Sequence, residues 1–296
     1  MDVLITGGTG FIGQALLPAL VNEGHSLTLL SRQESPYGGQ YPAVRSLDEI
    51  PSDRNIDAVI NLAGASMAGK RWSRRYKNEL NASRLTTTES LIRLFNRLER
   101  PPASFLSASA IGYYGHHGDE PLDEQGATVP GFAQSLCARW EGAAMQAEQL
   151  GVRTCLMRLG VVLDAGGGAL EQMLLPFKLG IGNWVADGRQ WFSWIHRADA
   201  VAAMRFLLEN EGFSGPFNLT APNPVTARDF CMAMTRQKRT LVNLPVPAPV
   251  MRAMIGEMAD ELLINGQKVM PSALQRAGFQ FHHQSIDEAL EAIFQS

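Results

Sequence analysis

Hydroxyl-bearing side chains cluster in the stretch FLSASAIGYYG, which spans residues 105–115. Ser107, Ser109, Tyr113 and Tyr114 all come directly behind an apolar run that predicts a buried strand. Hydroxyls gathered where a buried strand ends can hydrogen-bond a substrate or exchange a proton with it. These residues are therefore candidates for catalysis or ligand binding. The pattern does not identify the ligand or the partner residues.

A glycine-rich turn lies close to the N-terminus, in the stretch LITGGTGFIG. It contains a G-x-G-x-x-G that begins at Gly8, and also the spacing Gly7, Gly10, Gly13. Such glycines allow a tight turn and let the backbone approach a pyrophosphate, which the N–H groups of a following helix stabilise. Because the motif follows a predicted strand and opens a predicted helix, it predicts a dinucleotide site. The alternative is a glycine turn without a ligand.

The ends of two further strands contribute to the same prediction. The strand SLTLL ends in Ser31 and Arg32, where an NAD site usually has an acidic residue for the ribose 2′-hydroxyl. A hydroxyl and a guanidinium suit a 2′-phosphate instead, so NADP(H) is favoured over NAD, although Arg32 could be a solvated surface residue. A later strand ends in Leu62, Ala63 and Gly64, whose small size lets a planar ligand lie close to the backbone.

The elements that position these residues alternate between short apolar runs and longer helical patterns. This alternation predicts crossover units, a parallel sheet and helices on both faces, an α/β Rossmann-type doubly wound fold. The dinucleotide-binding domain is expected over residues 1–163, with its sheet completed by parts of 190–220, and a smaller α/β lobe over 164–296, which includes the segment 245–296. The predicted strands are Asp2–Thr6, Ser26–Leu30, Ala58–Leu62, Ser104–Ser107 and Val152–Leu159, and the predicted helices are Gly10–Glu23, Tyr76–Leu98 and Phe132–Leu150.

Composition excludes several classes of partner. The chain has 296 residues, 45% of them hydrophobic, and a formal charge of −3. This charge does not indicate binding to nucleic acid or to anionic lipid. It has no apolar run long enough to span a membrane, and its first strand begins too early for a signal sequence. The three cysteines lack metal-type spacing, so we expect free thiols in the cytoplasm. The adjacent His116 and His117 have no third ligand that would converge on an ion, and no metal site is expected.

The motifs together resemble the extended short-chain dehydrogenase/reductase superfamily. The resemblance is carried by TGGTGFIG, NLAG, FSWIHRADAVAAM and NLTAPNPVT. More narrowly, the chain resembles the atypical epimerase-family branch of that superfamily. The motifs of this branch are GKRW at 69–72, SR at 83–84, GYYG at 112–115, WE at 140–141 and a P-x-x-L-x-x-A-G-F pattern at 271–279.

The resemblance implies NADP(H) as cofactor and assigns residues to its site. Arg84 and Glu79 belong to this set because they match a helix that contacts the cofactor in the family, although Arg84 could instead be a surface residue. Val161, behind Arg158, matches the segment that passes the nicotinamide. The full cofactor set is Gly7, Thr9, Gly10, Phe11, Ile12, Gly13, Ser31, Arg32, Leu62, Ala63, Gly64, Glu79, Arg84, Ser107 and Val161.

The catalytic dyad of the family is missing from this chain. Ordinary members use a serine after the fifth strand, here Ser109, and a Tyr-x-x-x-Lys dyad whose lysine lowers the tyrosine pKa. Ala133 and Cys137 stand at the two dyad positions. We therefore expect an NADP-dependent oxidoreductase or epimerase with an unknown small-molecule substrate and an altered proton relay. In that relay Ser109 polarises the substrate, and a tyrosine of the GYYG turn or an ordered water supplies protons.

The alternative is a non-catalytic NADP(H)-binding protein that senses redox state or serves as a structural partner. Tyr113 and Tyr114 would then only form the cofactor wall or pack in the core. His196, at the matching family position, would satisfy backbone groups. Three tryptophans near the presumed substrate mouth, Trp184, Trp191 and Trp194, could shape an apolar substrate site or pack between the lobes. The sequence leaves the oligomeric state open.

Overall fold

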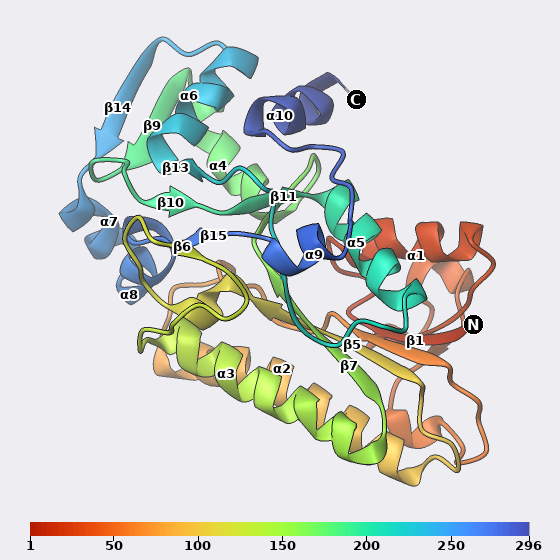
Figure 1. Cartoon of the computed structure of the whole chain (residues 1–296). Helices are drawn as coiled ribbons and strands as arrows, with labels where there is room; N and C mark the ends of the chain where they lie inside the picture. The colour runs from red at the N-terminus through yellow and green to blue at the C-terminus, as the bar shows by residue number, and fades with distance from the viewer. Residues whose placement is uncertain (296) are drawn as a thin grey trace.

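A parallel sheet of seven strands forms the centre of the computed structural model, which describes residues 1–295 (Figure 1). The strand order is β12-β7-β5-β4-β1-β2-β3, and every neighbouring pair is parallel. This is the α/β doubly wound arrangement expected from the alternation of strands and helices. The strands are β1 (Asp2–Thr6), β2 (Ser26–Leu30), β3 (Ala43–Val44), β4 (Ala58–Asn61), β5 (Ser104–Ala110), β7 (Arg153–Leu159) and β12 (Gly215–Leu219).

Helices cover both faces of this sheet. One face packs against α1 (Gly13–Asn22) and α5 (Arg197–Glu209), and the other against α2 (Arg74–Arg97) and the 3₁₀ turn η4 (Met145–Leu150) that follows α3 (Phe132–Ala144). Because both faces are covered, the strands are almost continuously apolar. Further 3₁₀ turns are η1 (Pro36–Gly39), η2 (Leu47–Glu49) and η3 (Ile111–Tyr114).

Strand β5 is longer than the sequence predicts. The prediction ended it at Ser107, so that Ser109 would follow the strand, but the strand continues to Ala110. It continues because β7 runs beside it over its whole length, and Ser109 is the register partner of Arg158. The site serines therefore lie within the sheet, and only the tyrosines follow it.

The smaller part of the chain is built from short elements at the carboxyl ends of the central strands (Figure 1). Its strands pair two by two, as β9 with β14, β10 with β13, β8 with β11, and β15 with β6. The strands are β6 (Pro121–Leu122), β8 (Val161–Leu163), β9 (Ile181–Val185), β10 (Trp191–Phe192), β11 (Trp194–His196), β13 (Val225–Thr226), β14 (Val242–Val246) and β15 (Lys268–Val269). The helices are α4 (Gly168–Lys178), α6 (Ala227–Gln237), α7 (Ala248–Ile255), α8 (Glu257–Ala259), α9 (Ser272–Arg276) and α10 (Ile286–Gln295), with a π-helical turn η5 (Asp260–Ile264).

Buried carboxylates connect the C-terminal segment to the central sheet and its helices. Asp199, at the start of α5, accepts hydrogen bonds from the backbone N–H groups of His282 and His283 at 2.8 and 2.9 Å. Glu124 accepts one from Asn218 on β12 and another from Ala273 on α9. Because both carboxylates are buried, these bonds satisfy charges that would otherwise be costly to remove from water.

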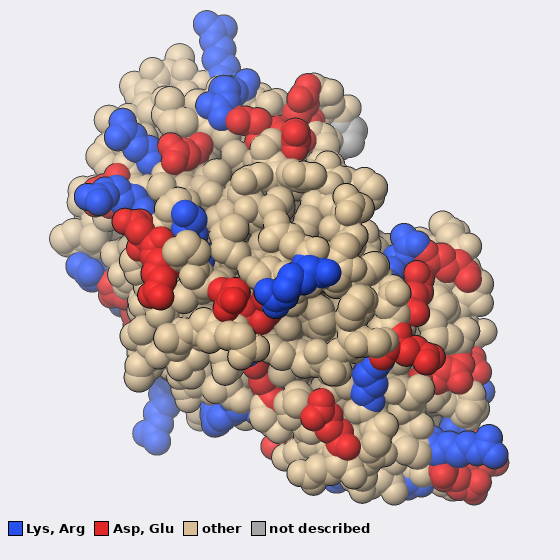
Figure 2. Space-filling view, in the orientation of Figure 1, with Lys and Arg blue, Asp and Glu red and all other residues tan. Residues whose placement is uncertain are grey.

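The surface mixes charges of both signs. Basic and acidic side chains alternate over the face seen in Figure 2, with uncharged surface between them. Among the helices of residues 1–295, none combines the length and the apolar character that crossing a bilayer requires.

Candidate functional site

The glycine turn between β1 and α1 is shaped so that larger residues cannot replace its glycines. Gly7 has φ +70°, and a Cβ there would lie 2.6 Å from the carbonyl carbon of Leu62 at the end of β4. A Cβ at Gly13 would overlap the backbone of Gly8, so the turn and the first residue of α1 are in direct contact. Within the described chain, the N–H groups of Phe11 and Ile12 donate to no backbone carbonyl. The turn thus offers free donors at a helix N-terminus, as a diphosphate requires.

Phe11 is held from the opposite side by the smaller lobe. Its ring lies against Gly167 and Gly168, at the start of α4. The guanidinium of Arg197 stands 4.6 Å from the ring centroid and donates to the Phe11 carbonyl at 3.3 Å, while Asp164 pairs with the same guanidinium. The glycine turn is therefore enclosed between the sheet and the lobe that begins after β8.

The end of β2 presents Ser31 and Arg32 as the sequence predicts. Ser31 is half-buried, and its Oγ accepts a hydrogen bond from the N–H of Gln33 at 3.1 Å. Arg32 is exposed and pairs with no other residue of the described chain, which leaves its guanidinium free for a phosphate. Sequence reasoning missed Tyr37, whose hydroxyl donates to the Gly8 carbonyl at 2.8 Å and brings this loop back to the glycine turn.

Arg84 lies inside the protein, beside the end of β4. It is buried, donates to the backbone carbonyls of Leu80 and Ala65, and packs against the Trp140 ring at 5.2 Å. No carboxylate within residues 1–295 pairs with it, and burial lowers the pKa of its guanidinium. The alternative interpretation of Arg84 as a surface arginine is therefore wrong. A buried cation next to Gly64 favours an anionic ligand at this edge of the sheet.

Ser109 belongs to a buried polar network. Its Oγ donates to Glu141 Oε1 at 2.6 Å, and Glu141 forms a two-pronged ion pair with Arg158, with both N–O distances at 2.9 Å. The two charged side chains are only 7% and 4% exposed. Ser107 lies two residues earlier on β5, where its Oγ accepts from Asn61 at 3.3 Å, so it joins the strands beneath the site.

The two tyrosines of the GYYG turn have different surroundings. Tyr114 is fully buried, and its hydroxyl donates to Asn218 Oδ1 at 2.7 Å while accepting from Arg158 at 3.0 Å. Burial raises its pKa to about 12, against the effect of the nearby Arg158. Tyr113 is half-buried, and its ring lies 3.5 Å from the Arg158 guanidinium carbon. Tyr114 therefore stays protonated at neutral pH, which is the opposite of the lowered phenol pKa in the usual dyad.

The GYYG turn packs against Ala133 and Cys137, the two residues at the dyad positions. A Cβ on Gly112 would stand 3.2 Å from Ala133 Cβ and 3.7 Å from the Cys137 sulfur, so the GYYG turn packs directly onto α3. Cys137 is buried, and its pKa is raised to about 12 by burial and by the charge of Glu141. Glu261 of the C-terminal segment caps α3 by accepting from the N–H groups of Phe132 and Ala133, both at 3.1 Å. Sequence reasoning did not find this contact.

The remaining predicted residues take structural positions at the rim. Val161 begins β8 and donates its N–H to Ser193 at 2.9 Å. His196 caps α5 by accepting from the N–H of Ala198, and its ring stacks on His283 with centroids 3.9 Å apart. Burial, followed by the neighbouring His283, lowers the His196 pKa.

The tryptophans divide between core and surface. Trp194 is fully buried and donates to a backbone carbonyl, whereas Trp191 donates to the Asp119 carboxylate at 2.8 Å. Trp184 is half-buried, with Arg228 5.4 Å from its ring. Glu79 is exposed on the first turns of α2 and pairs with Lys70 at 3.6 Å.

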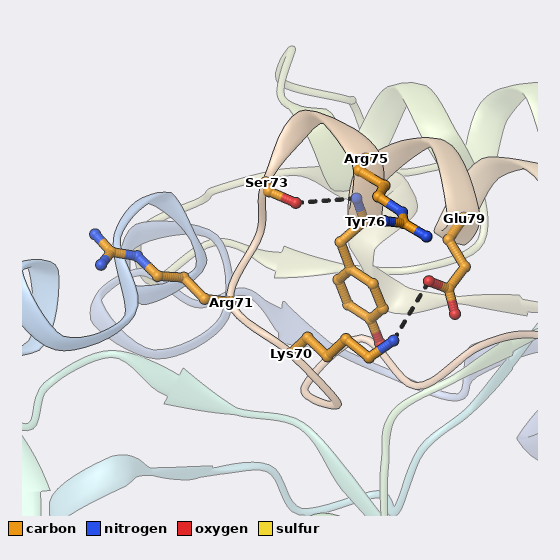
Figure 3. A pocket seen from close by; sticks show the side chains of 6 residues that line it. All are labelled: Lys70, Arg71, Ser73, Arg75, Tyr76 and Glu79. Atoms are coloured by element: carbon orange, nitrogen blue, oxygen red, sulfur yellow. Dashed lines mark hydrogen bonds and ion pairs between the residues drawn. The ribbon is translucent and has the colours of Figure 1, made fainter.

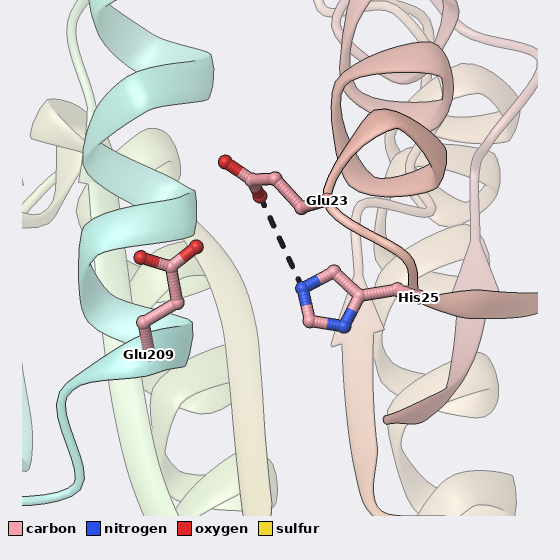
Figure 4. Close-up of side chains that lie close together, drawn as sticks. All are labelled: Glu23, His25 and Glu209. Atoms are coloured by element: carbon pink, nitrogen blue, oxygen red, sulfur yellow. Dashed lines mark ion pairs between the residues drawn. The ribbon is translucent and has the colours of Figure 1, made fainter.

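One group of side chains in the described part of the chain has metal-ligand spacing. Glu23 and His25 follow α1 and face Glu209 at the end of α5 (Figure 4), and their ligand atoms lie within 4.8 Å of one another. Arg205 already pairs with the Glu23 carboxylate, and His25 Nε2 lies 3.9 Å from it. We interpret the group as an ion-pair cluster that joins α1 to α5. His116 and His117 are not part of it; His117 contacts the Tyr114 carbonyl instead.

Comparison with known proteins gives this arrangement a family. Residues 3–219 match the model of the NAD-dependent epimerase/dehydratase family. The chain belongs to that family. Residues 246–293 of the chain match a second model, described as a domain of unknown function.

Relatives of this chain match nearly its whole length. Epimerase family protein Mb2239 of Mycobacterium bovis is 40% identical over 97% of this chain and 96% of its own length. The human epimerase family protein SDR39U1, solved with NADPH, is 33% identical and superposes with a TM-score of 0.90 over 100% of both chains. A nucleoside-diphosphate sugar epimerase from Corynebacterium glutamicum is 29% identical with a TM-score of 0.81, and the chain spans 58% of that protein.

Proposed function

We propose that the chain is an NADP(H)-dependent oxidoreductase or epimerase that acts on a small-molecule substrate through an altered proton relay. The observation that carries the cofactor assignment is the glycine turn, where a side chain at Gly7 would collide with the end of β4. The structurally similar human protein was solved with NADPH, which supports the same cofactor here. The cytoplasmic location and the domain boundary at residue 163 stay predictions.

The residues present fit the cofactor at both ends. The free N–H groups of Phe11 and Ile12 would hold the diphosphate, and Arg32 would pair with the 2′-phosphate. The buried cation of Arg84 supplies further positive charge beside the strand end at Leu62 and Ala63. When bound, NADP(H) supplies or accepts a hydride.

The proton chemistry would pass through Ser109 instead of a tuned tyrosine. Ser109 already donates a hydrogen bond to Glu141. A substrate hydroxyl that donates to Ser109 Oγ could therefore pass its proton to Ser109 while Ser109 passes its own proton to Glu141. Arg158 holds the Glu141 carboxylate in place through two hydrogen bonds. Tyr114, with its pKa raised to about 12, orients Arg158 and is not the proton acceptor.

A second function is favoured by the filled dyad positions. Because Gly112 packs onto Ala133 and Cys137, no phenol and ammonium can occupy the usual place, and Ser109 is almost fully buried. A chain that binds NADP(H) without turnover, as a redox sensor or structural partner, would tolerate this arrangement. The two functions differ in whether any substrate oxidises bound NADPH.

Cofactor choice can be tested by calorimetry. NADPH should bind well and NADH poorly, because Arg32 contacts a phosphate that NADH lacks. Arg32→Ala should reduce the difference in affinity between the two cofactors, because it weakens the binding of NADPH alone. The expected loss is about 1.5–3 kcal/mol of binding free energy, for one hydrogen bond to a charged group. Arg239→Ala, which removes an exposed arginine of the smaller lobe, should leave both affinities unchanged. Equal affinity of the native chain for NADPH and NADH would contradict the phosphate assignment.

Catalysis can be tested with a screen of carbonyl compounds and nucleotide sugars that follows NADPH oxidation. A substrate found in this way should turn over more slowly with Ser109→Ala and with Glu141→Gln, since both variants interrupt the same relay. Unchanged turnover in Ser109→Ala would remove Ser109 from the mechanism. Absence of turnover throughout the screen, with NADPH binding intact, would favour the non-catalytic function.

A further inference from the structure

A basic pocket opens where the loop after β4 enters α2. Its volume is 330 Å³, and its lining includes Lys70, Arg71 and Arg75 against the single acid Glu79 (Figure 3). The other two lining residues are Ser73 and Tyr76, which fix the shape of the loop: Ser73 accepts from the Tyr76 N–H at 3.1 Å, and the Tyr76 hydroxyl donates to the Ser66 carbonyl. Lys70 and Arg71 are the two middle residues of the GKRW motif, to which the cofactor site gives no role.

The positive charge of this pocket is not balanced by the protein. Lys70 pairs with Glu79 at 3.6 Å, but Arg71 and Arg75 form no ion pair with any residue between 1 and 295. Three cations and one anion leave a formal charge of +2 in a chain whose total is −3. A phosphate group carries about −1.5 to −2 charges at neutral pH and accepts several hydrogen bonds, so it matches the pocket in charge and in donors.

The C-terminal segment contacts one residue of the pocket lining, Arg71. Arg71 points toward the helices of that segment (Figure 3), and a Cβ on Gly256 would stand 3.2 Å from its Nε atom. One turn further along α2, Lys77 forms an ion pair with Glu257. The pocket therefore lies beside the segment 246–293, although its six lining residues all come from the loop before α2 and from α2.

We propose that this pocket binds the phosphate group of a phosphorylated small-molecule substrate. The assignment rests on the proposed function, which already places the cofactor's diphosphate at the glycine turn and its 2′-phosphate at Arg32. Tyr76 and Arg84 share one face of α2, eight residues and about 12 Å apart along the axis. A substrate anchored in the pocket thus has its remaining atoms within reach of the buried edge of the sheet.

The test is a titration of inorganic phosphate and of pyrophosphate into the full chain, followed by calorimetry at low ionic strength. Arg75→Gln should weaken binding about tenfold or more, the effect of one lost charge-assisted hydrogen bond. Glu79→Gln should tighten it roughly two- to fivefold, because it removes the only acid of the pocket and frees Lys70. Arg239→Gln is the matched control, and it should bind phosphate like the native chain.

Two further arms separate the possible sources of the phosphate. Saturating NADP⁺ should leave the affinity for phosphate unchanged. If NADP⁺ abolishes phosphate binding, the pocket belongs to the cofactor and the proposal is overturned. Equal phosphate affinities of Arg75→Gln and Arg239→Gln would overturn it as well. NADPH affinity is measured on the same variants: if Arg75→Gln retains it, a failed phosphate titration leaves the cofactor assignment standing. Circular dichroism confirms that the exposed substitution leaves the fold intact.

Discussion

Removing Glu141 should cost this chain much of its stability. Arg158 would lose two hydrogen bonds of 2.9 Å while it stays buried, and Ser109 would lose its acceptor. Removing one partner of a buried ion pair typically costs about 3–5 kcal/mol, and an unsatisfied buried hydroxyl adds about 1–3 kcal/mol when nothing replaces its partner. Because Arg158 keeps the Tyr114 hydroxyl and the Glu124 carbonyl, we expect about 4 kcal/mol for Glu141→Ala.

The assay is urea unfolding followed by tryptophan fluorescence, since the chain has five tryptophans. Asp287→Ala is the control: it breaks an ion pair with Arg236 at a similar distance of 2.6 Å, but both of those side chains are more than half exposed. Such a pair is worth about 1 kcal/mol or less. Glu141→Leu combined with Arg158→Met should lose less stability than Glu141→Ala, because no charge is left unpaired. Equal losses for Glu141→Ala and Asp287→Ala would refute the reasoning.

Three further changes test other contacts. Gly7→Ala should abolish NADPH binding, whereas Gly24→Ala, which has a similar positive φ but open space around it, should not; calorimetry on both separates steric overlap from backbone strain. Tyr114→Phe should lower the unfolding free energy by about 1–3 kcal/mol, because Asn218 Oδ1 loses its buried donor; chemical denaturation measures this, and no loss would contradict the contact. The free energy of unfolding should fall as pH drops below about 6.5, the ordinary histidine pKa, because burial lowers the pKa of His196 and the unfolded chain takes up the proton first. His196→Asn should reduce this dependence of the unfolding free energy on pH. An unchanged dependence in the variant would exclude a contribution from His196.

The parts of the fold that sequence reasoning predicted are those determined by local patterns. The glycine turn at Gly7 to Gly13 is recognisable because its backbone geometry depends on glycine, and the strands because both faces are apolar. The prediction of strand ends was less accurate, because β5 extends beyond Ser107 to Ala110 only through its pairing with β7. The extent of that pairing depends on a strand that begins more than 40 residues later.

The polar network was not predicted because its members are distant in sequence. Ser109, Glu141 and Arg158 come from two strands and a helix, and only tertiary structure brings them together. One signal was available: Arg158 interrupts an otherwise apolar strand, and a charge in such a strand needs a buried partner. The capping of α3 by Glu261 gave no comparable signal, because it pairs two segments separated by about 130 residues.

The buried carboxylate of Asp199 also has a consequence for how the chain is made. Its two backbone donors, at His282 and His283, follow it by 83 and 84 residues in the chain, and Ala273 reaches Glu124 from the same segment. Until that segment is made, Asp199 lacks both of these donors, and Glu124 has its bond from Asn218 but not the one from Ala273. Synthesis proceeds from the N-terminus, so the dinucleotide-binding part emerges first with these buried carboxylates incompletely paired. Its final packing therefore has to wait for residues 273–283, and a chain that stops after β14 would leave Asp199 without these two donors.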